Sequence, residues 1–186
     1  MVNRARKKLI KYMILAVVIS SLLLAVNWYL LWSASISNRT VLIPEFPFFT
    51  ITLIVSAIFG IIFLLCKQFK RTIKERLVIF LFGTCISLVV CSNLFDVYVY
   101  LFPEKTISYI TEYKVSYLGP RRGKFGRCEA GLRIKEQYTG RWIEFCSSKE
   151  ALKPGEQRKQ GMNGVFVVAK VNKLGAYIVQ YEFTDG

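Results

Sequence analysis

The strongest constraint on this chain is that its apolar residues fall into three long blocks, all of them before Pro103. The blocks cover residues 12–32, 47–66 and 77–102. The apolar core of a bilayer is about 30 Å thick and needs roughly 20 helical residues to cross it. Because the apolar residues are concentrated in blocks of this length, the sequence predicts three transmembrane helices and not the core of a soluble domain.

The first block has the features of a retained membrane helix. It follows a basic segment, residues 1–11, and it ends on Trp28, Tyr29 and Trp32, residue types common at a lipid–water interface. A cleaved signal peptide is the alternative, since a basic segment also precedes the apolar core of a leader. The block exceeds the usual leader core of about 7–15 residues, and Ser33–Ser35 is its only, weak, cleavage candidate. We therefore favour a retained helix.

Positive charge is distributed unequally among the short connecting segments. Residues 1–11 and 67–76 each contain five Lys or Arg, whereas the connection Ser33–Glu45 contains only Arg39. Cytoplasmic loops are enriched in Lys and Arg, so this asymmetry predicts a cytoplasmic N-terminus and a cytoplasmic second connection. Three crossings then place residues 103–186 outside the cytosol, which in a bacterium means an inner-membrane protein with a periplasmic domain. The fifteen basic and nine acidic residues of that domain do not oppose this, because long domains translocate largely regardless of charge.

Residues 103–186 change to a pattern of strands and turns. Ile107–Leu118 is rich in β-branched and aromatic residues, and two hairpins are predicted after it, one turning at Thr139-Gly140 and one at Asn172–Gly175. In the last strand we expect the alternating apolar residues on one face: Tyr177, Val179, Tyr181 and Phe183. The sequence predicts a small all-β domain, either barrel-like or sandwich-like. A domain of about 80 residues is marginally stable and benefits from a covalent cross-link.

The five cysteines fall into two groups. Cys66, Cys85 and Cys91 lie within or at the end of apolar blocks, where a small helix-packing role is the simplest interpretation. Cys128 and Cys146 lie on the two arms of a predicted hairpin, so in an oxidising compartment we expect a disulfide between them. Two isolated cysteines in a chain without histidine do not make a four-ligand metal site, and we expect neither a metal nor another cofactor.

A basic glycine-rich segment precedes the first of these hairpins. Residues 119–127 read GPRRGKFGR and contain four cations: Arg121, Arg122, Lys124 and Arg127. Such a loop near a bilayer is a candidate site for anionic headgroups, lipopolysaccharide phosphates or an acidic partner protein, and a solvated hairpin tip is the simpler alternative. The chain's net charge of +14 would suggest nucleic acid in a soluble protein. Here membrane-flanking loops and a basic outer domain explain the charge, so we expect no nucleic-acid partner.

Three polar residues lie in the predicted membrane region: Asn27, Asn93 and Asp96. Ionisable residues in a span are candidates for an ion or substrate path, because burying them in lipid is costly. Asp96, however, is close to the outer end of its span, where water or a hydrogen bond with Asn27 or Asn93 is the simpler interpretation. The small residues Ser56, Ala57 and Gly60 of the second block favour close packing of helices within the chain.

The absence of histidine removes the commonest general acid or base and the Ser-His and Cys-His nucleophile pairs. We therefore expect a non-catalytic inner-membrane protein whose disulfide-linked periplasmic domain binds a partner outside the cytosol, either a subunit of an envelope complex or a toxin that it neutralises. A component of an oligomeric channel or transporter is the first alternative. An envelope enzyme is the second, with Glu129, Glu136 and Glu144 as its available carboxylates. The sequence leaves the oligomeric state open.

Overall fold

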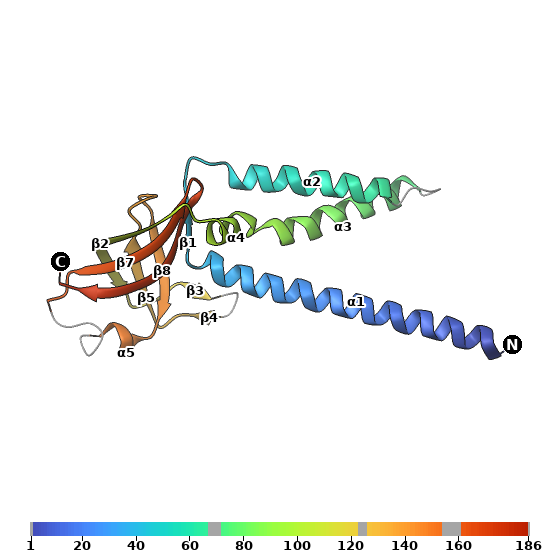
Figure 1. Ribbon diagram of the computed structural model, residues 1–186, viewed down its shortest axis with the longest axis horizontal. Helices are drawn as coiled ribbons and strands as arrows, with labels where there is room; N and C mark the ends of the chain where they lie inside the picture. Colours follow the sequence, from blue (N-terminus) through green and yellow to red (C-terminus); the bar gives the residue numbers. More distant parts are fainter. Residues whose placement is uncertain (1, 67–71, 123–125, 154–160, 186) are drawn as a thin grey trace.

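The computed structural model describes residues 2–66, 72–122, 126–153 and 161–185. Long helices extend from one end of a β domain (Figure 1): α1 (Val2–Ser37), α2 (Phe48–Cys66) and α3 (Ile73–Cys91), which is followed by the short α4 (Leu94–Leu101). Three helical stretches are long and apolar enough to cross a membrane, namely Ile10–Ser37, Phe48–Leu65 and Ile73–Leu101. The three predicted apolar helices are therefore present.

The third predicted helix is divided in two. α3 ends at Cys91, and α4 starts at Leu94. Of the two residues between them, Ser92 and Asn93, Asn93 has a φ of −106° and a ψ of 14°, which depart from helical values. At its other end α3 begins before the predicted position, because the Thr72 hydroxyl accepts a hydrogen bond from the Glu75 amide and forms a capping box there. The division gives α4 its own direction, and it packs against the β domain.

The β domain is built on a six-stranded antiparallel sheet with the order β1-β8-β7-β2-β5-β6. Its strands are β1 (Thr40–Leu42), β2 (Lys105–Ser116), β5 (Ala130–Lys135), β6 (Trp142–Ser147), β7 (Gly164–Asn172) and β8 (Gly175–Thr184). A separate ribbon pairs β3 (Arg121–Arg122) with β4 (Gly126–Arg127), and α5 (Lys149–Leu152) follows β6. The first eight residues of β2 pair with β7 and its last four with β5, which curves the sheet into a nearly closed barrel. The predicted all-β domain is confirmed, and its form is barrel-like.

Alternating side chains of the central strands form the core of the barrel. In β7 the inward residues are fully buried: Val165, Val167, Ala169 and Val171. They pack with Leu132 and Ile134 of β5 and with Ile178 of β8. This is the alternation expected for a sheet with one buried face.

The face predicted for the last strand is partly wrong, because β8 contains a bulge. Val168 pairs with Gln180 but Ala169 pairs with Ile178, so Val179 is an extra residue on β8. Tyr181 and Phe183 pack against the core as predicted, whereas Val179 is 38% exposed. Before the bulge it is Ile178 that is buried, and Tyr177 instead packs its ring against Tyr100 of α4, 4.8 Å away.

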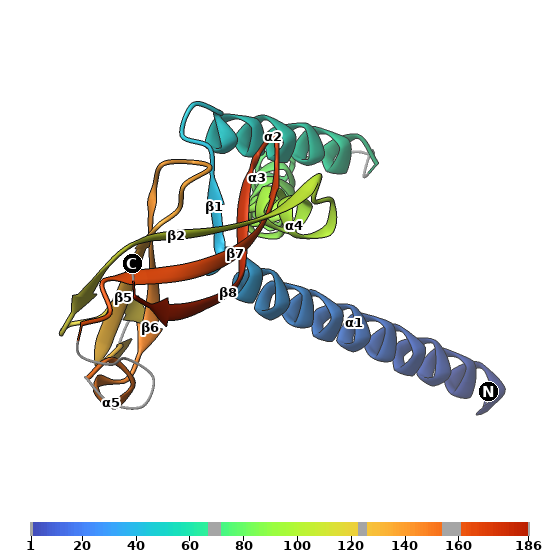
Figure 2. The same ribbon diagram turned by 60° about the vertical axis from the view of Figure 1, so that its left-hand side comes forward.

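Small residues hold α2 and α3 together as a helical pair. Ser56 is fully buried, and a Cβ atom added to Gly60 would clash with the Thr84 hydroxyl and crowd the Phe80 ring. Gly83 of α3 faces the same contact: a Cβ atom added there would lie 3.0 Å from the Phe63 Cβ and 3.4 Å from the Gly60 Cα. The small-residue face of α2 thus packs within the chain, as predicted. Figures 1 and 2 show α1 diverging from this pair toward its N-terminus.

Candidate functional site

The connection between α1 and α2 is part of the C-terminal sheet. Its three-residue strand β1 pairs with the start of β8, with Val41 opposite Ala176 (Figure 2). On either side of this pairing the Ile43 amide donates to the Leu174 carbonyl at 3.0 Å and the Ile178 amide donates to the Arg39 carbonyl at 2.9 Å. The connection and the C-terminal domain therefore lie on the same side of the helices and form one unit.

Gly175 permits the close approach of these two strands. A Cβ atom at this position would clash with the Val41 carbonyl oxygen and lie 3.0 Å from the Leu42 Cα. The side chain of Val41 itself is only 6% exposed, so β1 contributes to the packing as well as to the hydrogen bonds. The sequence predicted only a connection over Ser33–Glu45, because a three-residue strand carries too little alternation to be recognised.

A cavity of about 300 Å³ lies where the two end strands of the sheet, β1 and β6, face each other. Its lining includes Thr40 and Val41 from β1, Arg141 and Trp142 at the start of β6, and Ser37 and Asp96 from the helices. The Arg141 guanidinium bridges the two ends by donating to the Leu42 carbonyl at 3.2 Å.

Asp96 is the buried charged group of this cavity. It sits in the first turn of α4, is 8% exposed, and lines the cavity together with Ser37 at the end of α1. Among the residues that the structure describes, Asp96 has no ion-pair partner within 4.0 Å, although Arg141 lines the same cavity. A buried carboxylate without a counter-charge is energetically costly, which makes this cavity a candidate binding site.

The other two predicted polar residues lie elsewhere. The Asn93 amide donates to the Ser33 hydroxyl at 3.1 Å and joins the α3–α4 turn to α1, while Asn27 is on an exposed face of α1. The structure thus places Asn27, Asn93 and Asp96 in three different environments. Asp96 shares its cavity with Ser37 and not with Asn27 or Asn93, the two residues expected as its hydrogen-bond partners.

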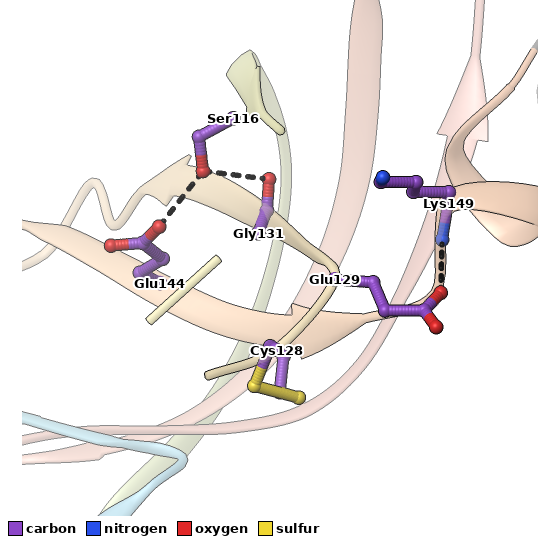
Figure 3. Close-up of a disulfide and its surroundings, with 7 residues drawn as sticks. Ser116, Cys128, Glu129, Gly131, Glu144 and Lys149 are labelled. Carbon is purple, nitrogen blue, oxygen red and sulfur yellow. Dashed lines mark hydrogen bonds between the residues drawn. A yellow bond between two sulfur atoms is a disulfide. The ribbon is translucent and has the colours of Figure 1, made fainter. Parts of the chain in front are cut away.

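The predicted disulfide between Cys128 and Cys146 is present, with Cα atoms 5.5 Å apart (Figure 3). The residue opposite Cys146 in the β5–β6 ladder is Gly131, so Cys128 lies just before the paired strand. Cys128 closes the base of the β3–β4 ribbon: its amide donates to the Pro120 carbonyl and its carbonyl accepts from the Gly119 amide. The disulfide therefore fastens the base of the basic ribbon to β6.

The basic ribbon presents two arginines across one pair of strands. Arg121 is directly opposite Arg127, and both side chains are exposed. Arg122 belongs to β3, but its side chain and the whole of Lys124 lie outside the described residues. Like charges directly opposite each other are destabilising, so an anion between Arg121 and Arg127 would stabilise the ribbon. In the view of Figure 1, in which the helices run roughly horizontally, the ribbon lies at about the same horizontal position as the C-terminal end of α1.

The carboxylates of the β domain have separate structural contacts. Glu136 is fully buried and accepts from the Tyr109 hydroxyl at 3.1 Å and from the amide and hydroxyl of Thr139. Burial and the adjacent Glu136 carboxylate raise the pKa of Tyr109 well above its usual value. Glu144 accepts from Ser116, and Glu129 accepts from the Lys149 amide (Figure 3). Each of these acids thus stabilises a turn or a strand pairing.

Within the part of the chain that the structure describes, His, Cys, Asp and Glu side chains do not gather in groups of three or more that could hold a metal ion. The cavity between β1 and β6 depends on Ser37 and Thr40 together with Arg141, which lies about a hundred positions further along the chain, and none of the three carried a sequence signal. No protein-family model, curated protein or solved structure matches the chain. Its function is therefore argued from the geometry described above.

Proposed function

We propose that this chain is a non-catalytic protein of a bacterial inner membrane that holds a disulfide-linked β domain in the periplasm and binds a partner protein there. The partner is a subunit of an envelope complex or a secreted toxin that the protein neutralises. The observation that carries the proposal is the pairing of β1 with β8, which makes the short α1–α2 connection an integral part of the domain. A domain joined to the helices in this way is held close to the membrane surface.

Charge and redox chemistry support the periplasmic orientation independently. The basic start of α1, and Lys74 and Arg76 at the start of α3, lie at the ends of these helices away from β1, as expected if those ends are cytoplasmic. The Cys128–Cys146 disulfide suits an oxidising compartment, and disulfides are rare in the cytosol.

The basic ribbon is the surface that best suits a partner. Arg121 and Arg127 face each other without an ion pair among the described residues, and the disulfide fixes the base of the ribbon to the barrel. An exposed cationic ribbon with a fixed base is complementary to an acidic protein surface, and complementary charge accelerates association and selects the partner.

Thiol labelling in intact cells tests the orientation. A maleimide that cannot cross the membrane should label Cys128 and Cys146 only after a reductant is added, in a variant whose other cysteines are replaced by serine. A variant that also lacks Cys128 should expose Cys146 to the reagent without reductant. Labelling that requires permeabilised membranes would refute the periplasmic orientation.

Charge reversal tests the partner surface. Cross-linking in cells should capture a partner with the wild-type chain, and Arg121→Glu combined with Arg127→Glu should reduce that capture at least about tenfold, because two charged contacts become repulsive. The matched control, Lys149→Glu with Lys153→Glu, changes the net charge equally but on and beside α5. Equal capture by both double variants would refute the assignment of this surface.

A further inference from the structure

We propose that the cavity between β1 and β6 binds a small zwitterion, with its primary ammonium on Asp96 and its anionic group near Arg141, and that the zwitterion is the phosphoethanolamine headgroup of a bilayer lipid. This site is separate from the basic ribbon and goes beyond partner binding.

The carboxylate of Asp96 determines the cationic end of the ligand. Asp96 is nine-tenths buried, and the polar Ser37 lines the cavity beside it. An ammonium group would supply the counter-charge that the described residues do not, and charge-assisted N–H hydrogen bonds are about twice as strong as neutral ones. A divalent cation is a poor alternative, because Ca²⁺ takes six to eight oxygen ligands and the cavity contains one carboxylate.

Arg141 determines the anionic end. One terminal nitrogen of its guanidinium donates to the Leu42 carbonyl, which holds the side chain at the mouth of the cavity and leaves other N–H donors available. Guanidinium groups bind phosphate and carboxylate oxygens with matching geometry. Because Asp96 and Arg141 line one cavity without pairing with each other, a ligand with both charges fits between them.

The position of the cavity favours a lipid as the source of this zwitterion. The Phe95 ring, one residue before Asp96, packs on the Phe48 ring at the first residue of α2, with centroids 5.2 Å apart. Trp32, a residue of the predicted interfacial belt, packs on Tyr100 in the same helix as Asp96. Asp96 therefore lies at the depth where the apolar helices begin, which is the depth of lipid headgroups. The volume of about 300 Å³ is at the lower end of the range for small-molecule sites.

Lipid retention by the full-length protein tests the proposal. The purified chain is placed in nanodiscs that contain either phosphatidylethanolamine or phosphatidylcholine in an anionic background, and the lipid retained after detergent extraction is counted by native mass spectrometry. Phosphatidylcholine keeps both charges but has no N–H donor. We expect at least about tenfold preferential retention of phosphatidylethanolamine, as charge-assisted hydrogen bonds require.

Variants connect the preference to the site. Asp96→Asn and Arg141→Gln should each abolish it, whereas Glu104→Gln and Lys149→Gln, exposed charges outside the cavity, should retain it. An intact Cys128–Cys146 disulfide and an unchanged circular dichroism spectrum confirm folding of each variant. An equal preference in wild type and both cavity variants, or no preference in wild type, would overturn the lipid assignment.

A second arm distinguishes a lipid from a soluble zwitterion. Free phosphoethanolamine and free glycine are titrated into the chain in a non-ionic detergent. Suppose that one of these soluble zwitterions binds, that Asp96→Asn and Arg141→Gln abolish its binding, and that the protein shows no preference among lipids. This result would support the site and overturn the bilayer as the source of the ligand. Absence of binding in both arms would overturn the site itself.

Discussion

Replacing Gly175 with valine should separate β1 from the β domain. The new Cβ atom would overlap the Val41 carbonyl oxygen, and the opposing atoms belong to the backbone, so they cannot turn away as a flexible side chain can. The separation would expose Val41, whose burial is worth about 1.5–3 kcal/mol. It would also break the hydrogen bonds of the Ile43 and Ile178 amides, worth about 0.5–1.5 kcal/mol each. Together these contributions predict a local loss of about 2.5–6 kcal/mol, with a middle value of about 4 kcal/mol.

Hydrogen exchange of the full-length protein measures this loss at the two amides. Because about 1.4 kcal/mol corresponds to a factor of ten, the Ile43 and Ile178 amides should exchange more than about 100-fold faster in Gly175→Val than in wild type. Gln180→Val is the matched control, since it introduces the same side chain at an exposed position of β8 beyond the residues paired with β1. Wild-type protection of both amides in Gly175→Val would show that β1 is not held as described.

Three further predictions concern the cross-link, the helical pair and alkaline pH. Replacing Cys128 and Cys146 by serine should lower the free energy of unfolding by about 3 kcal/mol, because the disulfide closes a loop with an 18-residue separation and restricts the unfolded chain. In chemical denaturation, a reductant should lower the stability of the wild type by the same amount and leave that of the serine variant unchanged. Gly60→Leu should separate α2 from α3 and lower the midpoint of unfolding in sodium dodecyl sulfate, whereas Ile61→Leu on the exposed face should not. Because the pKa of Tyr109 is raised in the folded protein, above about pH 10 this residue ionises in the unfolded chain but stays protonated in the folded one. The free energy of unfolding should therefore fall as the pH rises above about 10. Tyr109→Phe should make this fall less steep in denaturation curves recorded across the same pH range.

The sequence by itself determined which segments form helices and which form strands, because these local structures can be recognised without knowing the long-range packing. Apolar blocks of bilayer length form helices whatever their neighbours, and the order of three helices before a domain of strands follows directly. The hairpin turns at Gly140 and Lys173-Leu174 were also local, since turn residues and flanking alternation mark them. The pairing of Cys128 with Cys146 followed from their places on one hairpin, although the partner of Cys146 across the ladder is Gly131.

Alternation misled the prediction where one residue shifted the register. The bulge at Val179 leaves Tyr181 and Phe183 on the core side but puts Ile178 in the place where Tyr177 was expected. A single inserted residue reverses every side chain on one side of it, because the period of a strand is two. The opposing strand determines where that insertion falls, and residue patterns within β8 do not reveal it.

Only the tertiary structure decided the junction between the helices and the barrel. Strand β1 is three residues long and its partner β8 lies more than 130 positions away, so its pairing depends on contacts that no local pattern encodes. The same holds for the cavity, which brings Ser37, Asp96 and Arg141 together from the end of α1, the start of α4 and the start of β6. Burial gives the Asp96 carboxylate its energetic cost, and burial is a property of the assembled fold.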